Sequence, residues 1–150
     1  DYINDLYFRD GVGGTFGRLR LMSVAACHML FTNEIPKQFP GLKFGFIEAS
    51  AQWVPYMLHD LKRRLETRGR KLDDDPMKTN NIWVTCQTDD DLPYVLSYSG
   101  EDNLVLGSDY GHADTSAEID AIRKLQEDSV IPSHVVDKIL GDNPQTLYGI

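Results

Sequence analysis

The sequence predicts a parallel α/β fold, and three features of the 150-residue chain support this prediction. Three short apolar runs occur in order, and each is followed by polar residues and then by a segment with helical periodicity. The runs are near-continuous rather than alternating, which is typical of strands buried on both faces of a parallel sheet. The predicted order is one helix, three strand–helix units and a final helix.

The first predicted elements are a helix and a strand. Apolar residues fall nearly all round residues 19–31 (LRLMSVAACHMLF), which predicts a well-buried helix. His28 lies within it and is expected to pack rather than to bind a ligand. After two prolines and a glycine break the chain, the run LKFGFI at residues 42–47 predicts a buried strand.

A clear amphipathic helix is predicted between the first and the second strand. Pro55 suits the first turn of this helix, and Gly69 is expected to mark its end. A polar linker is expected over residues 70–80, before IWVTCQ at residues 82–87, which predicts the second strand. The apolar stripe of the helix consists of Val54, Met57, Leu58, Leu61 and Leu65.

The last third of the chain continues the alternation. Residues 89–100 (DDDLPYVLSYSG) predict a short helix with acids at its positive end, and NLVLGSD at residues 103–109 predicts the third strand. TSAE at residues 115–118 is a capping box that should start the next helix. Ser133 is expected to cap a final helix that ends at Gly141.

Composition and charge exclude several classes of function. The net charge of −8 argues against nucleic acid or an anionic membrane as a partner, because both reward clustered Lys and Arg. No apolar run approaches 18 residues, so no membrane span is expected. Cys27 and Cys86 lie in apolar segments and predict free buried thiols, which favours a reducing compartment such as the cytoplasm.

Three parallel strands cannot close on themselves, so two architectures remain open. One is a small open α/β domain. The other is the C-terminal part of a (β/α)₈ barrel, which needs about 250 residues in all.

Functional residues of parallel α/β folds collect at the carboxyl ends of strands. Asp109 follows the third strand, where it can bind a divalent cation or take a proton, or can simply cap a turn. Glu48 follows the first strand, with functional and structural roles equally open. Gln87 follows the second strand, and His112 comes three residues after Asp109. Trp53 can stack on an aromatic substrate or pack at a helix start.

Three segments together resemble the C-terminal portion of the amidohydrolase-related metal-dependent hydrolases and decarboxylases: FPGLKFGFIEASAQWVPYMLHDLKRR, NLVLGSDYGHAD and ILGDNPQTLYGI. The resemblance implies a TIM-like barrel in which the strands here are the sixth, seventh and eighth. Residues 1–150 would then form a single partial α/β-barrel domain that lacks the N-terminal strands and their metal ligands. Its partners would be a small-molecule substrate, the missing part of the barrel and, as a further option, a second copy of the chain.

The resemblance also implies an activity, namely hydrolysis or decarboxylation of a small carboxylic substrate, aromatic in some members. By position Asp109 would be the metal ligand and would activate water or substrate, with zinc as the expected ion and manganese or iron as alternatives. Glu48 stands where many members have a histidine and would share the catalytic work. Trp53, Gln87 and His112 would contact substrate, and the 150 residues alone are expected to be inactive. The alternative is a non-catalytic α/β binding or assembly module that has lost the metal site, which the missing histidine favours.

Overall fold

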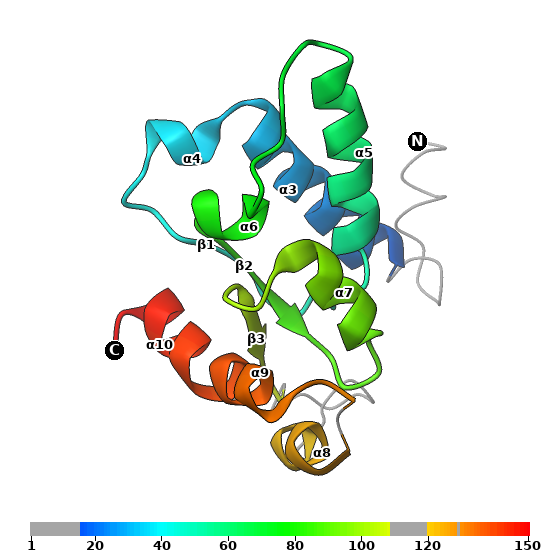
Figure 1. The fold of residues 1–150 in the computed structure, drawn as a ribbon, viewed down its shortest axis with the longest axis vertical. Coiled ribbons are helices and arrows are strands. Elements are labelled where there is room, and N and C mark those ends of the chain that lie inside the picture. Colours follow the sequence, from blue (N-terminus) through cyan, green and yellow to red (C-terminus); the bar gives the residue numbers. More distant parts are fainter. Residues whose placement is uncertain (1–15, 109–119, 129) are drawn as a thin grey trace.

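The computed structural model of the chain describes residues 16–108, 120–128 and 130–150 (Figure 1). Two of the predicted site residues, Asp109 and His112, lie outside the described residues. The predicted capping box at residues 115–118 also lies outside them.

A three-stranded parallel sheet forms the centre of the described fold. Its strands are β1 (Phe44–Phe46), β2 (Ile82–Cys86) and β3 (Leu104–Leu106), in the order β1-β2-β3. Gly45 pairs with Trp83, and Thr85 pairs with Val105. The parallel α/β fold predicted from the apolar runs is thereby confirmed, with each strand shorter than its apolar run.

Helices surround this sheet and follow each strand in turn (Figure 1). They are η1 (Phe16–Leu21, π-helical), α3 (Met22–Thr32), α4 (Ile35–Gln38), α5 (Val54–Glu66), α6 (Pro76–Thr79), α7 (Leu92–Ser99), α8 (Ala121–Asp128), α9 (Ser133–Asp137), η2 (Lys138–Asp142, π-helical) and α10 (Asn143–Tyr148).

The two faces of the sheet carry different sets of side chains, because neighbouring residues of a strand point to opposite sides. Ile82, Val84 and Cys86 belong to the main hydrophobic cluster, which also contains the apolar stripe of α5. We call this side the outer face. Trp83 and Thr85 are buried but lie outside that cluster, so they occupy the opposite, inner face. β2 is therefore buried on both faces, as its unbroken apolar run predicts.

Helix α10 reaches the inner face near the start of β1. A side chain at Gly45 would meet Leu147 of this helix, and the Lys43 ammonium donates a hydrogen bond to the Thr146 carbonyl. The last helix thus spans from β3, which it follows in sequence, to β1 at the other end of the sheet.

Three local expectations were wrong. The linker predicted over residues 70–80 contains helix α6, whose first turn is capped by the Asp75 carboxylate through the Lys78 amide. Ser133 does not cap α9, since Pro132 holds the cap position. The chain also remains helical through Gly141, because η2 continues directly into α10.

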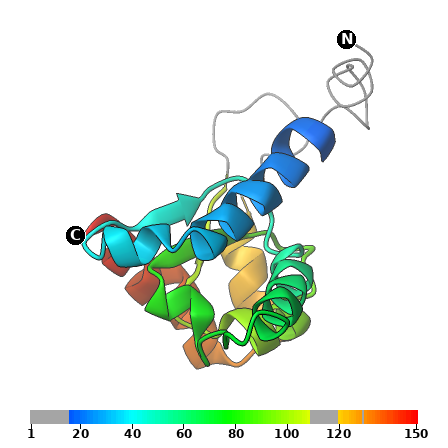
Figure 2. The ribbon, with the colours of Figure 1, turned by 90° about the horizontal axis from the view of Figure 1, so that it is seen from above.

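Helix α3 is less buried than its composition predicts. Only Cys27 and Phe31 are buried, whereas Met22 and Met29 are 58% and 60% exposed. Figure 2 shows η1 and the N-terminal end of α3 extending together beyond the rest of the described fold. An all-round apolar helix is normally covered on every side, so α3 presents an uncovered apolar face.

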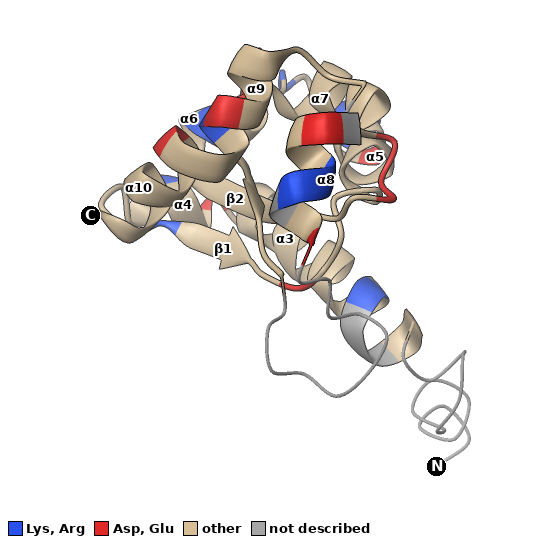
Figure 3. Cartoon of the chain, turned by 90° about the horizontal axis from the view of Figure 1, so that it is seen from below, with Lys and Arg blue, Asp and Glu red and all other residues tan. Residues whose placement is uncertain are grey.

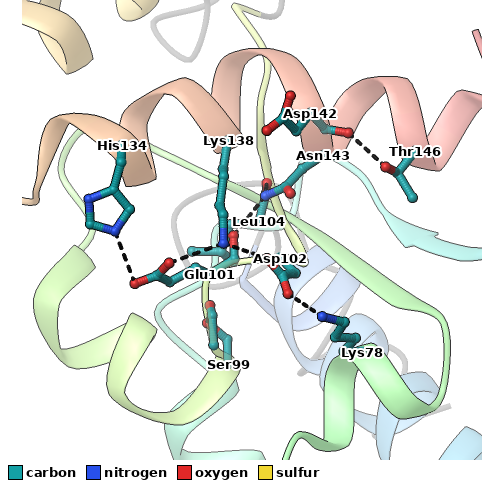
Figure 4. A network of polar contacts seen from close by, with 11 residues as sticks. Lys78, Ser99, Glu101, Asp102, Leu104, His134, Lys138, Asp142, Asn143 and Thr146 are labelled. Atoms are coloured by element: carbon teal, nitrogen blue, oxygen red, sulfur yellow. Dashed lines mark hydrogen bonds and ion pairs between the residues drawn. The ribbon is translucent and has the colours of Figure 1, made fainter.

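A polar network joins the amino end of β3 to α6, which precedes it, and to η2 and α10, which follow it (Figure 4). The Asp102 carboxylate accepts hydrogen bonds from Lys78 at 2.6 Å and Lys138 at 2.8 Å. The buried Asn143 amide donates to the carbonyls of Glu101 and Leu104. These bonds fix α6, η2 and α10 to the same loop.

Basic and acidic residues alternate over the helices in the view of Figure 3, and Lys and Arg do not gather into one patch there. None of the helices in the described ranges has the length and hydropathy of a membrane span. Cys27 and Cys86 are both free and buried, as predicted.

Candidate functional site

The carboxyl ends of the three parallel strands meet at one edge of the sheet, where sites of parallel α/β proteins form. We call this edge the carboxyl edge. In the described residues it consists of residues 47–53 after β1, residues 87–91 after β2, and Gly107 and Ser108 after β3. Glu48, Trp53 and Gln87 therefore lie at this edge, where the sequence placed them.

The Asp90 carboxylate joins the first two of these loops. It accepts a hydrogen bond from the Ser50 hydroxyl at 2.5 Å and from the Ala51 amide at 2.8 Å, both in the loop after β1. It also accepts from the Gln87 amide at 2.9 Å, in its own loop. A second link runs the other way, from the Asp91 amide to the Gln52 side-chain oxygen at 2.7 Å. The two loops are consequently held in one fixed arrangement.

Glu48 and Ser50 adopt the left-handed backbone conformation, with φ of 61° and 57°. Side-chain-bearing residues avoid this region, at a cost of about 1–2 kcal/mol each. Such conformations persist where the surroundings over-determine them, and they cluster at functional sites. Here Asp90 holds Ser50, and the carbonyl of Glu48 is held by a side chain from another element.

That side chain is Arg20 of η1. Its Nη1 donates to the Glu48 carbonyl oxygen at 2.9 Å, and its Nη2 lies 3.5 Å from Oε1 of Gln87. Arg20 thus spans the ends of β1 and β2, bringing a positive charge to an edge that otherwise carries carboxylates.

Trp53 lies at the base of the same edge. Its ring packs edge-to-face on Phe46, with centroids 5.8 Å apart, and its indole N–H donates to the Ala49 carbonyl at 3.1 Å. The side chain is partly buried. Its packing role is therefore visible, and stacking on a substrate stays a prediction.

A pocket of about 410 Å³ opens beside the loop after β2. Thr88, Asp89 and Asp90 line it from this loop, and Lys124 and Leu125 line it from α8. It is a mixed polar and apolar hollow next to Asp90.

The described residues alone do not form a metal site. Nowhere in the described ranges do three His, Cys, Asp or Glu side chains gather closely enough to hold an ion. The carboxylate of Glu48 is one donor of the right kind at the carboxyl edge, but the described ranges do not complete a set of three around it. Asp109, the predicted ligand, lies outside the described residues.

Sequence reasoning missed Arg20 and Asp90. Arg20 falls in the predicted first helix, and helical periodicity says nothing of a contact 67 residues away. Asp90 is the middle residue of the DDD run, which was interpreted only as acids at a helix start. Asp91 has that role, since it caps α7 through the Tyr94 amide. The run therefore contains one helix cap and one loop clamp.

Comparison with known proteins indicates the larger architecture to which the described fold is similar. No protein-family model matches the chain, and no curated protein sequence matches it. Among solved structures, the chain is similar to an amidohydrolase from Mycobacterium avium subsp. paratuberculosis K-10, with 26% identity and a TM-score of 0.62. This match covers 87% of the chain and 34% of the amidohydrolase.

A second similar structure is 5-carboxyvanillate decarboxylase LigW from Sphingomonas paucimobilis, with 20% identity and a TM-score of 0.58. The match covers 83% of the chain and 38% of the decarboxylase, and at this identity it shows the fold alone. The chain thus spans about a third of the length of each of these enzymes.

Both structures are TIM-barrel members of the amidohydrolase superfamily. The described fold has the parts of the end of such a barrel: three adjacent parallel strands, a helix after each, and a final helix. The chain therefore has the fold of the C-terminal part of an amidohydrolase-type TIM barrel, and the resemblance predicted from its sequence is confirmed.

Proposed function

We propose that the chain supplies the C-terminal part of a metal-dependent amidohydrolase-type enzyme that hydrolyses or decarboxylates a small carboxylic acid. The observation that carries this proposal is the carboxyl edge, where the Glu48 carboxylate sits on a left-handed backbone held by Arg20. The fold shared with an amidohydrolase and a carboxylic acid decarboxylase supports the same class of reaction.

Within this proposal Asp109 and Glu48 are the catalytic carboxylates. Asp109 directly follows the loop after β3, and it would bind a divalent ion, zinc first and manganese or iron as alternatives. A bound divalent ion makes water acidic enough to supply hydroxide near neutral pH. Gln87, Trp53 and His112 are the proposed substrate contacts.

The apolar surface of the described fold supports a further part of the proposal, namely that more of a barrel covers it. β1 has no second neighbour among the described strands, and Leu42 and Ile47 beside it are each 52% exposed. The uncovered face of α3 adds Met22 and Met29. In a closed barrel each strand has two neighbours, and each helix packs between helices. We propose that the preceding strand–helix units of a barrel cover this surface, and that the 150 residues alone are inactive.

The test is to purify the longest natural form of the chain and to measure bound metal by elemental analysis and turnover of 5-carboxyvanillate and related aromatic carboxylates. We expect stoichiometric metal in the wild type and loss of both metal and turnover in Asp109→Asn. Asp74→Asn is the matched control, because Asp74 is exposed and pairs only with Lys71 in the described structure.

Two results would contradict the proposal. One is a natural form without stoichiometric metal, which would favour a non-catalytic α/β binding or assembly module. The other is unchanged metal content and turnover in Asp109→Asn, which would remove Asp109 from the site.

A further inference from the structure

The head group of Arg20 lies on the side of the carboxyl edge that a barrel would enclose. Trp83 and Thr85 lie on the inner face of β2, and Gln87 is the next residue of the same alternation. Nη2 of Arg20 lies 3.5 Å from the side-chain oxygen of Gln87. The guanidinium therefore reaches the inner side of the edge from η1.

Arg20 differs from other arginines of the described structure in the charge of its partners. Arg63 and Arg64 pair with Asp60, and Arg70 pairs with Glu34. Arg20 instead bonds a backbone carbonyl and an amide oxygen, both neutral. In the described part of the chain no carboxylate pairs with it, so neutral groups orient its charge without cancelling it.

The chemistry of the side chain indicates what it would bind. A guanidinium has five N–H donors in a planar fork, and two of them orient Arg20 on Glu48 and Gln87. The remaining donors can take a carboxylate through two parallel hydrogen bonds. Orienting an arginine in advance also reduces the entropy lost when an anion binds.

We propose that Arg20 is the substrate-binding residue that holds the carboxylate of the substrate at the carboxyl edge. This inference rests on the proposed function, because that function supplies the carboxylate. It assigns the role to a residue of the helix before β1, whereas the predicted substrate contacts all follow strands.

The experiment measures binding of isophthalate, an aromatic dicarboxylate, to the longest natural form after dialysis against a chelator. Isophthalamide, its neutral isostere, tests the need for charge, and inorganic phosphate tests the kind of anion. The variants are Arg20→Gln and Arg20→Lys, with Arg63→Gln as the control because Arg63 is an exposed arginine of α5. Isothermal titration gives the Kd, and circular dichroism shows that each variant is folded.

We expect Arg20→Gln to raise the Kd for isophthalate about tenfold or more, the effect of losing one charge-assisted pair. Arg20→Lys should keep part of the binding, because lysine keeps the charge but lacks the fork. If Arg20→Gln does not fold, Arg20→Lys still tests the proposal. Arg63→Gln should bind like the wild type, and isophthalamide should bind weakly to every form.

An unchanged Kd in a folded Arg20→Gln protein would overturn the proposal, as would the absence of saturable binding to the wild type. Phosphate binding as tight as isophthalate binding would contradict the assignment to a carboxylate. The metal-free titration is independent of turnover. A protein that binds isophthalate through Arg20 but holds no metal would therefore refute the proposed function and leave the anion site standing.

Discussion

The Asp90 carboxylate accepts a 2.5 Å hydrogen bond from the Ser50 hydroxyl and thereby links the loops that follow two neighbouring strands. The same carboxylate accepts backbone N–H groups from both loops, at Ala51 and Gln87. Three bonds on one charged acceptor make Asp90 the group on which the shape of the carboxyl edge most depends.

Removing the charge of Asp90 should weaken this edge. An asparagine keeps one acceptor oxygen and puts an amide where a carboxylate oxygen accepted a bond, so we expect Asp90→Asn to lower the free energy of unfolding by about 1–3 kcal/mol. Urea unfolding measures the change. Asp89→Asn is the control, because Asp89 is exposed, and a similar loss in both variants would contradict the special role of Asp90.

The left-handed conformation of Glu48 predicts an unusual order of stability for two substitutions at this position. Glu48→Ala and Glu48→Gly both remove the carboxylate, but only alanine keeps the cost of φ at 61°. We expect the glycine variant to be more stable than the alanine variant by about 1 kcal/mol. At Lys62, inside α5, the same comparison should favour alanine by about 1 kcal/mol. If the two Glu48 variants unfold alike, the conformation carries no strain.

The thiol of Cys86 should resist alkylation in the folded chain. Burial, and next the charge of Asp90, raise its pKa from 9.0 to about 12. Because the thiolate is the reactive form, iodoacetamide at pH 8 should label Cys86 only after unfolding. Mass spectrometry with and without urea checks this, and rapid labelling of the native protein would argue against a buried strand.

The same raised pKa makes stability depend on pH. Above about pH 9 the thiol ionises in the unfolded chain but stays protonated in the folded one until about pH 12. Its contribution is thus fully present below pH 9 and is lost as the pH rises. We expect the free energy of unfolding to fall less steeply over this range in Cys86→Ala. Equal slopes for the two proteins would remove Cys86 as a cause.

The hydrogen bonds of Asp102, which lies before the amino end of β3, predict how stability depends on pH and on mutation there. Hydrogen bonds from Lys138 and Lys78 lower the pKa of Asp102 below 3.8, so its contribution is present above that pH and is lost as the pH falls through the lowered value. Asp102→Asn should cost up to about 1 kcal/mol at neutral pH, since the pairs are partly exposed. Thermal unfolding measures it, and Asp74→Asn, which removes an exposed pair, should have no measurable effect.

The uncovered face of α3 predicts that one substitution has different effects in residues 1–150 alone and in a longer natural form. Met29→Lys should reduce self-association of residues 1–150 alone, because it removes an exposed apolar side chain. In a longer natural form, where we propose that this face is covered, the same change should lower the free energy of unfolding by about 2 kcal/mol or more. Sedimentation and urea unfolding give the two results. Tyr56→Lys on α5, where Tyr56 is 72% exposed, is the control that should be neutral in both.

Local patterns were sufficient to predict most of the fold. The apolar runs around Phe44, Val84 and Val105 all became strands of a parallel sheet, because short apolar runs that lie between turn signals and contain aromatic or β-branched residues favour buried strands. The stripe of α5 packed as its spacing predicts, and Glu48 and Gln87 came to the carboxyl edge because parallel strands end on the same side.

Contacts between distant segments were decided only by the tertiary structure. Nothing near Arg20 in sequence indicates Glu48 or Gln87 as its partners, and the DDD run does not say which aspartate clamps a loop and which caps a helix. The exposure of α3 likewise depends on which elements surround it. The sequence by itself determined the elements and the edge at which they end, because these follow from periodicity and burial along the chain. Only the tertiary structure decided where the charge of Arg20 lies. Its partners Glu48 and Gln87 are 28 and 67 positions away in the sequence, and folding alone brings them into contact with it.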